Sequence, residues 1–532
     1  MVLAKSVVRT HRSVTRRKFL AGLGLAGVAW AGLPSMLNAG RAEAAGETPR
    51  RGGVLRYGME SPPSALDPHS GPGRELHGMT YSRLVALNDD WTGVEPDVSD
   101  RWETSADGKT YTFHLRPNVR FHDGSLMTAE DVLFSFERIL NKATAAYVGG
   151  FLYDVVEQVT APTPSTLQVR LNAPFGAFLS ILALPQAAIV SKKWVTGGGD
   201  LRTTQMGTGP VKFVSLEPNS RITLTRHTQY YDPALPYLDG VTMLFMPDDT
   251  ARSVALRNGS VDFIDYVPWK DMDAIKRDPK LRMYTDTTST GLWAMFNVRR
   301  PPLDNVLIRR AINWAANREA MVKVAFFGHG SPMLNIPLPK TSWAYASDLP
   351  KFGYDPDRAR SLIKESGVKM PARLEILSHS DDLFWKQSSE VMVGNLQDLG
   401  FEVTLTALTS PPGNAQFNAG NFQIGWRGGG PLYTDPDFLF TYFHSQGAVG
   451  RLLGYQNQQL DDLLLAARRT VDRTRRRSIY IAVYKILYDD APWMPLTWRE
   501  QGEAAAAYVR GYHRTLGSSW NADRIVKTWL AK

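Results

Sequence analysis

Strand-like and helix-like patterns alternate along the chain from about residue 45 to its end, and this limits the fold more than any other feature. Residues 54–58 are strand-like, and residues 111–116 alternate apolar and polar side chains as a half-buried strand does. Further strands are expected at 222–224, 241–246, 374–377 and 403–408. Interspersed helices and strands are typical of a mixed α/β fold.

Capping residues mark the beginnings of the intervening helices. Thr128 with Asp131 resembles a capping box, and it precedes a helix with apolar residues at 132, 136, 139 and 140. Asp355 followed by Pro356 predicts a helix that Gly367 ends. Two more helices are predicted, one capped by Asp304 and one with the apolar stripe Leu460, Leu463, Leu464 and Ala467.

The first 44 residues form a segment of their own. The pair Arg16-Arg17 precedes an apolar stretch at 21–33, and the small-residue site Ala42-Glu43-Ala44 follows. This order resembles a twin-arginine (Tat) signal peptide, and the apolar stretch is short for a membrane span. We therefore expect residues 1–44 to be removed and the mature protein to lie outside the cytoplasm. The alternative is a basic N-terminal tail.

The composition excludes several partners and chemistries. The chain has 532 residues and a net charge of +9, but residues 1–44 hold seven basic residues and one acidic residue, which leaves +3 for the rest. Basic and acidic residues that are so nearly equal in number argue against nucleic-acid binding. The absence of cysteine removes disulfides, thiolate metal ligands and the lipidated cysteine of an anchored protein. No later segment is apolar and long enough for a membrane span.

Six stretches of the chain together carry a family resemblance. The longest spans 97–138 and contains Asp107-Gly108-Lys109-Thr110-Tyr111-Thr112-Phe113, Phe121-His122-Asp123-Gly124 and Thr128-Ala129-Glu130-Asp131. The others are Gly207-Thr208-Gly209-Pro210, residues 247–262, 296–313 and 354–367, and Asp490-Ala491-Pro492-Trp493-Met494-Pro495-Leu496. In this order they resemble the peptide/nickel (family 5) periplasmic solute-binding proteins of ABC importers.

The resemblance implies an α/β fold of two lobes joined by a hinge, the type II periplasmic binding protein fold, with a subdomain inserted in lobe one. Lobe one is expected at 46–90, 206–292 and 497–532, the inserted subdomain at 91–205, and lobe two at 293–496, with crossings near Gly291 and Trp498. Such a protein captures a peptide or peptide-like solute by lobe closure and delivers it to the membrane permease and its ATPase. We expect a periplasmic monomer without lipid anchor, cofactor or catalytic residues.

The resemblance also implies which segments meet the solute. The first is the loop 66–74, with His69, Ser70 and Gly71, and the second is 424–430, with Trp426, Gly428 and Gly429. In peptide binders of the family, an extended ligand pairs with backbone at the second segment, where glycine permits close approach. Trp293 and Phe296, near the predicted hinge, are further candidates. For the aromatic residues the alternative is core packing.

One position departs from the family pattern. Peptide binders carry an aspartate soon after the tryptophan, and that carboxylate pairs with the peptide ammonium group; here the position is Gly429. Arg427 stands beside it, and a guanidinium binds carboxylate or phosphate with two hydrogen bonds. We therefore expect a solute with an acidic group, such as a modified peptide or an opine-like conjugate. The alternative for Arg427 is a solvent-facing or ion-paired strand arginine.

Other functions are weighed against this one. The chain lacks a nucleophile elbow, a His-Glu-x-x-His motif, a P-loop and a dinucleotide fingerprint, so we expect no enzyme. A carrier of a chelated metal such as nickel is an alternative, because His69 and His77 lie near the predicted solute loop, although no histidines show metal-ligand spacing. A binding protein that feeds a chemoreceptor has the same sequence features.

Overall fold

The computed structural model describes residues 47–532 apart from residues 72–73, 90–91, 336, 339, 341, 382, 430–434 and 515–521. Residues 48–532 belong to one unit. The predicted signal segment, residues 1–44, lies outside the described residues. None of the helices described in residues 47–532 is long and apolar enough to cross a membrane.

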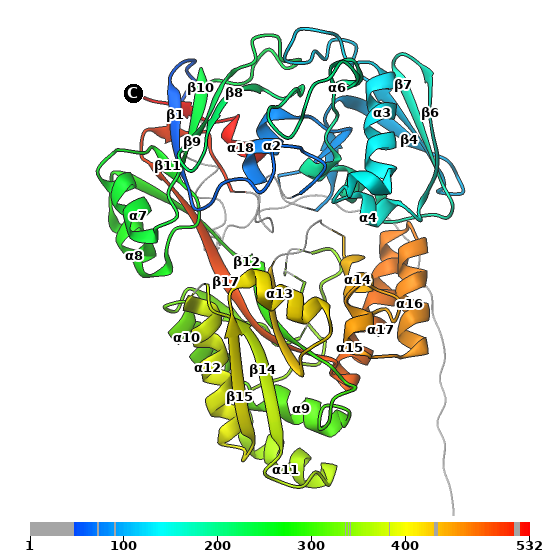
Figure 1. Cartoon of the computed structure of the whole chain (residues 1–532), viewed down its shortest axis with the longest axis vertical. Coiled ribbons are helices and arrows are strands. Elements are labelled where there is room, and N and C mark those ends of the chain that lie inside the picture. Colours follow the sequence, from blue (N-terminus) through cyan, green and yellow to red (C-terminus); the bar gives the residue numbers. More distant parts are fainter. Residues whose placement is uncertain are drawn as a thin grey trace, which may run out of the picture. The chain divides into compact units, whose positions relative to one another are not determined.

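Eleven strands form one continuous sheet (Figure 1). They are β1 Val54–Met59, β8 Val211–Glu217, β9 Arg221–Arg226, β10 Gly240–Phe245, β11 Phe263–Ile264, β12 Leu281–Phe296, β13 Gly330–Pro332, β14 Arg373–His379, β15 Glu402–Leu408, β16 Ile424–Gly429 and β17 Trp493–Ala506. Their order is β15-β14-β16-β12-β17-β11-β1-β10-β9-β8, and β13 pairs with β17. The strands predicted at 54–58, 222–224, 241–246, 374–377 and 403–408 are confirmed.

The long strands β12 and β17 join two groups of strands. On one side lie β11, β1, β10, β9 and β8, which we call group A; on the other lie β16, β14 and β15, which we call group B. The two long strands pair antiparallel, with irregularities between Asp286 and Thr290 and between Leu292 and Trp293. Gly291 lies opposite Trp498. The two positions at which the sequence predicts crossings between lobes are therefore paired residues.

A second, antiparallel sheet of four strands lies within residues 99–171. Its order is β4-β5-β7-β6, with β4 Ser99–Thr104, β5 Thr110–Leu115, β7 Thr166–Leu171 and β6 Val156–Thr163. Helix α3, Ala129–Leu140, begins as predicted, because the Thr128 N–H donates to the Asp131 carboxylate at 2.9 Å. The predicted apolar side chains Val132, Phe136 and Ile139 are buried.

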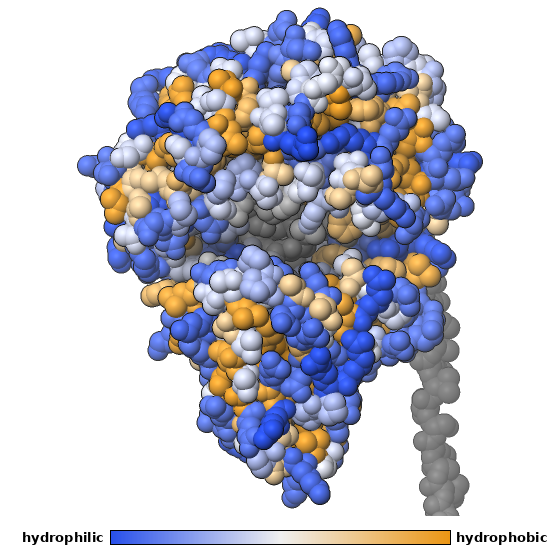
Figure 2. Space-filling model, viewed as in Figure 1, coloured by the Kyte–Doolittle hydropathy of each residue, from blue (hydrophilic) through white to orange (hydrophobic). Residues whose placement is uncertain are grey.

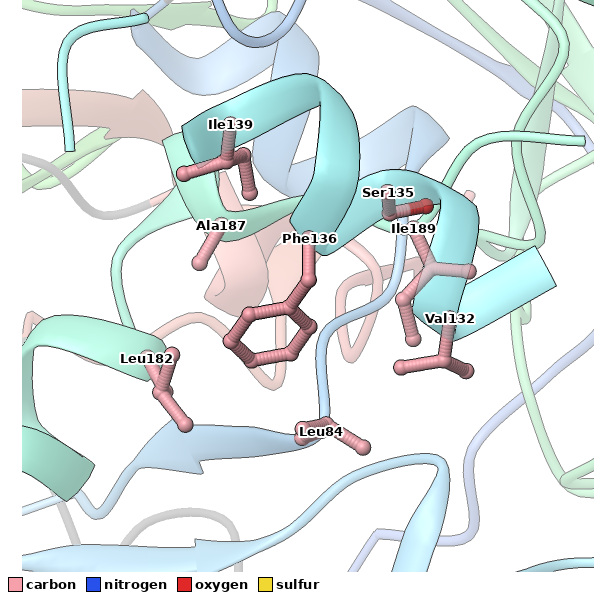
Figure 3. Close-up of a pocket in the computed structure, with 8 residues that line it drawn as sticks. All are labelled: Leu84, Val132, Ser135, Phe136, Ile139, Leu182, Ala187 and Ile189. Atoms are coloured by element: carbon pink, nitrogen blue, oxygen red, sulfur yellow. The ribbon is translucent and has the colours of Figure 1, made fainter. Parts of the chain in front are cut away.

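A small cavity lies beneath α3 (Figure 3). It is lined by Leu84, Val132, Ser135, Phe136, Ile139, Leu182, Ala187 and Ile189. Its volume is about 10 Å³, which is close to the minimum that one water molecule requires. The Ser135 hydroxyl already donates to the Asp131 carbonyl and accepts from the Val190 N–H. This cavity is therefore a gap in apolar packing, too small for a solute.

Helices and short strand pairs surround the two sheets. The helices are α2 Arg74–Thr80, α4 Gly149–Leu152, α5 Phe178–Leu182, α6 Lys192–Thr196, α7 Asp249–Arg257, α8 Trp269–Arg277, α9 Val306–Ala315, α10 Arg318–Ala325, α11 Pro356–Ser366, α12 Leu383–Gln397, α13 Ser410–Asn418, α14 Phe438–Phe443, α15 Gly450–Leu453, α16 Gln458–Arg469, α17 Arg473–Asp490 and α18 Ala522–Ile525. The short pairs are β2 Val85–Leu87 with β3 Val94–Pro96, and β18 Val509–Arg510 with β19 Trp529–Leu530.

The predicted helix ends are confirmed with one correction. Asp355 caps α11 and Gly367 ends it with a φ of 71°. The helix with the stripe from Leu460 to Ala467 is α16. The prediction that Asp304 caps a helix is wrong by one residue: Asn305 caps α9, because its side-chain oxygen accepts from the Leu307 N–H at 2.9 Å.

Apolar side chains cover both faces of the sheet around group B. Leu292, Ala294 and Phe296 point into a cluster that includes residues of α9, α10 and α12. Trp293 and Met295 point into the opposite cluster, which includes residues of α13, α14, α16 and α17 and extends into the four-stranded sheet. At this junction the Gly176 N–H donates to the Arg468 carbonyl at 3.0 Å. Successive β12 residues thus face opposite layers, as strand geometry requires.

Candidate functional site

The strand directions place a candidate site at the middle of β12 and β17. In group A, β1 runs parallel to β10 and β11, and in group B, β14 runs parallel to β15 and β16. The last residue of β11, Ile264, pairs with Ala504, which lies opposite Met283. The last residue of β16, Gly429, pairs with Gly291. The carboxyl ends of the two groups therefore point toward each other across the stretch between Met283 and Gly291.

Open α/β sheets bind ligands outside the carboxyl ends of their parallel strands. Both predicted solute segments lie there, because the loop 66–74 follows β1 and residues 424–430 include the end of β16. The face of the molecule in Figure 2 is hollowed between its upper and lower parts. The side chains of the two segments then decide what the site can hold.

The loop after β1 is bound to α3. Asp67 receives two hydrogen bonds from the Arg138 guanidinium. His69 is fully buried: its Nδ1 accepts from Arg138 at 2.7 Å, and its Nε2 donates to the Ala188 carbonyl at 2.8 Å. Burial lowers the pKa of His69 to about 4, so the ring is neutral. We predicted His69 as a solute contact, but both of its ring nitrogens are occupied by the protein and it fixes the loop.

The other two predicted contacts in this loop, Ser70 and Gly71, differ in their exposure to solvent. Ser70 is exposed, with its hydroxyl donating to the Asp67 carbonyl at 3.3 Å, whereas Gly71 is buried. Of the three predicted residues in this loop, only Ser70 has a side chain open to solvent.

Two of the predicted aromatic contacts lie in the core. Trp426 is 1% exposed, and its indole N–H donates to the Ser388 hydroxyl at 3.2 Å. Phe296 is fully buried in the same cluster. For both residues the structure favours the alternative of core packing, because their side chains face the layer formed by α9, α10 and α12.

Arg427 projects from the opposite face of β16. Its guanidinium lies 3.5 Å from the centre of the Phe417 ring and donates to the Asn414 side-chain oxygen at 2.5 Å. Among the described residues no carboxylate lies within ion-pair distance of Arg427. Burial lowers the pKa of Arg427 to about 10, so it stays protonated at neutral pH. Arg427 is thus a partly buried cation whose charge no described acid balances, and it does not form the predicted alternative, an ion pair.

Trp293 lies beside Arg427 on the same face. The two residues are direct partners in the β12–β16 pairing. Trp293 is 6% exposed, and its buried indole N–H has no hydrogen-bond partner among the described residues. The ring of Tyr442, from α14, lies edge-on to Trp293 at a centroid distance of 6.1 Å. The charge of Arg427 also acts on His379, at the end of β14, because burial and this charge lower the pKa of the His379 ring.

The glycines of β16 serve two different purposes. A Cβ at Gly428 would lie 2.8 Å from the Trp385 ring and 2.9 Å from the Gly291 carbonyl oxygen, so Gly428 permits close strand packing. Gly429 has a φ of 147°, which side chains other than hydrogen disfavour, and nothing lies within 4 Å of its virtual Cβ. The backbone at position 429 therefore suits glycine and not the aspartate that the family resemblance implies at this position.

We expect Gly428→Ala to lower the free energy of unfolding by about 1–3 kcal/mol, because the added methyl group would separate β16 from β12. Gly394→Ala is the matched control. Gly394 lies inside α12 with open space around its virtual Cβ, so alanine should stabilise the protein by about 0.5–1 kcal/mol through helix propensity. Urea unfolding measures both changes, and a loss of equal size in the two variants would contradict the packing argument.

The acids that follow β16 are committed to arginines. Asp435 binds the Arg476 guanidinium with two hydrogen bonds of 2.6 Å, and Asp437 binds Arg468 with bonds of 2.9 and 2.8 Å. Both carboxylates are buried. Neither therefore takes the place of the missing aspartate at position 429.

The two histidines considered for a metal carrier are both buried. The ring nitrogens of His69 are both bound by the protein; His77 donates from Nε2 to the Leu66 carbonyl at 3.1 Å, and its Nδ1 has no hydrogen-bond partner among the described residues. No group of three or more potential ligands that could hold a metal ion is found in the described part of residues 47–532.

Sequence reasoning did not identify Tyr442, Asn414 and Phe417 as neighbours of Arg427. Asn414 and Phe417 lie on α13, and Tyr442 lies in the apolar segment Phe438–Phe443. An aromatic residue in such a helix is read as core. The only available signal was the apolar helix that closely follows Arg427 along the chain.

Comparison with known proteins gives one family. The model for bacterial extracellular solute-binding proteins, family 5 (Middle), matches residues 93–450. The dipeptide-binding protein of Escherichia coli K12 is 27% identical over 495 residues, which cover 86% of this chain and 92% of that protein.

Solved structures share the fold. AgaA of A. tumefaciens R10, in complex with agropinic acid, is 29% identical with a TM-score of 0.79, covering 90% of this chain and 99% of its own. The ABC transporter-associated periplasmic binding protein DppA of Helicobacter pylori, in complex with the peptide STSA, is 27% identical with a TM-score of 0.80, covering 91% and 99%. The prediction of a two-lobed α/β periplasmic binding protein fold is confirmed.

Proposed function

Because the chain belongs to family 5 of the bacterial extracellular solute-binding proteins, we propose that it captures a small peptide-like solute with an acidic group. The solute is held where the carboxyl ends of groups A and B face each other, and closure of the two lobes encloses it. The closed protein then delivers the solute to the permease and ATPase of an ABC importer. The observation that supports an acidic group in the solute is the charge of Arg427, which no described acid balances.

The lobes follow the limits that the sequence suggests. Lobe one comprises 46–90, 206–292 and 497–532, lobe two comprises 293–496, and residues 91–205 form the inserted subdomain. The paired positions Gly291, on β12, and Trp498, on β17, lie at the hinge, and Ser331 of β13 also pairs with Trp498. A hinge made of two paired strands allows the groups to rotate while their hydrogen bonds are kept.

The described acids that follow β16 leave no free carboxylate for an ammonium group. Gly429 brings no carboxylate, and Asp435 and Asp437 are bound by arginines. A buried cation is favourable only when an anion or several acceptors satisfy it, so a solute carboxylate beside Arg427 would supply what the described residues do not. Among relatives, AgaA binds the acid agropinic acid, whereas H. pylori DppA binds a peptide. An acidic solute of the kind bound by AgaA fits Arg427 better than an unmodified peptide does.

The protein acts in the periplasm. Residues 1–44 form a twin-arginine signal that is removed, and the mature protein diffuses freely because the chain has no cysteine to carry a lipid. It works as a monomer, and of the predicted solute contacts Ser70, Trp293, Arg427, Gly428 and Gly429 are retained.

The proposal is tested by a thermal-shift screen of residues 45–532 against agropinic acid, other opines, organic acids and peptides, followed by calorimetry on each hit. We expect acidic solutes to raise the melting temperature, and Arg427→Gln to weaken their binding about tenfold to a hundredfold, because a charge-assisted contact is lost. Arg373→Gln is the control, since Arg373 is 88% exposed at the far end of β14 and pairs with Glu402.

Two results would reject the proposal. One is a set of hits among neutral or basic peptides only, with acidic solutes silent. The other is unchanged affinity of Arg427→Gln for an acidic hit, with Arg373→Gln also unchanged. In that second case the solute carboxylate is held elsewhere.

A further inference from the structure

Three hydrogen-bond donor groups gather beside the end of β16, and among the described residues only the Asn414 side-chain oxygen accepts from any of them. They are the Arg427 guanidinium, the Trp293 indole N–H and the Tyr442 hydroxyl, which we call the donor cluster. The indole N–H is buried and unpaired among the described residues, and the guanidinium has one neutral partner, Asn414. No described residue forms a hydrogen bond with the Tyr442 hydroxyl. A buried donor without an acceptor destabilises the protein, so a ligand that supplies acceptors to this cluster would be stabilising.

Strand geometry brings the first two donors together. Trp293 and Arg427 are directly opposite in the antiparallel β12–β16 pair, so their side chains leave the same face of the sheet. Opposite residues in such a pair have Cβ atoms about 5 Å apart, which is within the reach of an indole and a guanidinium for a common ligand.

Helices α13 and α14 complete the cluster. The centre of the Phe417 ring lies 3.5 Å from the guanidinium carbon, so it holds one face of the guanidinium by a cation–π contact. Nη1 donates to Asn414, and among the described residues the other N–H groups have no acceptor. Tyr442 packs edge-on against Trp293, at an interplanar angle of 85°. The charge of Arg427 also acts on Tyr442, where it opposes the rise in pKa that burial causes. The hydroxyl is therefore protonated at neutral pH and can donate.

Resting on the proposed function, we infer that the donor cluster is a carboxylate subsite, in which Arg427 supplies the charge and the Trp293 N–H and Tyr442 hydroxyl bind the same carboxylate. A carboxylate accepts at about four positions and donates at none, which matches three donors. A carboxamide of the same shape presents an NH₂ group to this cluster, where it finds a donor instead of an acceptor. Trp293 and Tyr442 therefore set the selectivity for acid over amide.

The experiment uses acetate as the probe and acetamide as its neutral match. Residues 45–532 are labelled with ¹⁵N-tryptophan, and Trp293→Phe assigns the indole signal among the 13 tryptophans that remain when Trp30 is removed from the 14 of the full chain. We expect millimolar acetate to shift the Trp293 indole N–H signal, acetamide to leave it in place, and Arg427→Gln to abolish the shift. Tyr442→Phe keeps the ring and removes the hydroxyl, and it should weaken acetate binding about tenfold.

The outcomes separate this inference from the proposed function. In one outcome, Arg427→Gln abolishes the binding of acidic solutes, while Tyr442→Phe and Trp293→Phe bind them as the parent protein does. The proposed function is then kept, and the carboxylate subsite formed by the donor cluster is overturned. An indole signal that acetate leaves unmoved, or that acetamide moves equally, also overturns it. Matching thermal unfolding of the two phenylalanine variants and the parent protein shows that a loss of binding is not a loss of folding.

Discussion

Asp435→Leu should lower the free energy of unfolding by about 3–5 kcal/mol, because it leaves the Arg476 guanidinium buried without its counter-charge. Only 2% of the Arg476 side chain and 6% of the Asp435 side chain are exposed. The carboxylate accepts the two bonds of 2.6 Å from Arg476 and one of 3.0 Å from the Asp437 N–H, while Arg476 also donates to the Ala467 carbonyl and the Tyr480 hydroxyl. Urea unfolding followed by circular dichroism measures the change.

Two further variants show whether charge burial is the cause. Glu130→Gln breaks the exposed Lys192–Glu130 pair and should cost less than about 1 kcal/mol. The double variant Asp435→Leu with Arg476→Met removes both charges and should recover most of the loss, since replacement of a whole buried ion pair is often neutral. A double variant as unstable as Asp435→Leu alone would show that shape, and not the stranded charge, accounts for the effect.

The parts of the fold that the sequence predicts are those that depend on near neighbours. Asp131 reaches back three residues to cap α3, and Pro356 and Gly367 bound α11 with their own backbone preferences. The Asp304 error is of the same local kind, because two adjacent residues can both cap and only the packed structure selects Asn305.

The candidate site was predicted less well, because its side chains are decided by distant residues. His69 is buried by Arg138 and Ala188, and Trp426 is held by Ser388. None of these partners can be found from patterns around the predicted residue. The sequence shows that Arg427 is basic and lies at a predicted strand end, but its lack of an ion pair among the described residues depends on the layer that packs around it.

The pairing of the strands connects the locally predicted elements with the candidate site. The sequence places strands before the loop 66–74 and at residues 424–429, but it does not say that their carboxyl ends face each other. The pairing of β11 with β17 and of β16 with β12 decides that. Once the register is known, the general rule for parallel strands puts Arg427 at the site without any comparison to relatives.

The second large effect expected is a loss of stability in mild acid. His69, His77 and His227 are buried, and burial lowers the pKa of each to about 4. In the unfolded chain a histidine has a pKa near 6.5, so between about pH 6.5 and 4 the unfolded state binds protons that the folded state does not. Stability therefore falls as the pH falls through this window, by roughly 2 kcal/mol per histidine at pH 5.

Each of these rings donates to a backbone carbonyl, namely Ala188, Leu66 or Gly209, and that bond survives protonation. The penalty for His77 and His227 is therefore one of burying charge. For His69, protonation also removes the hydrogen bond that Nδ1 accepts from Arg138, and Arg138 adds repulsion that Asp67 only partly offsets. Urea unfolding at pH 7.5, 6 and 5 should show the decline, and NMR of the folded protein should find these rings neutral at pH 5.5. Folded-state titration of the three rings near pH 6.5 would remove the linkage, and with it the predicted acid sensitivity.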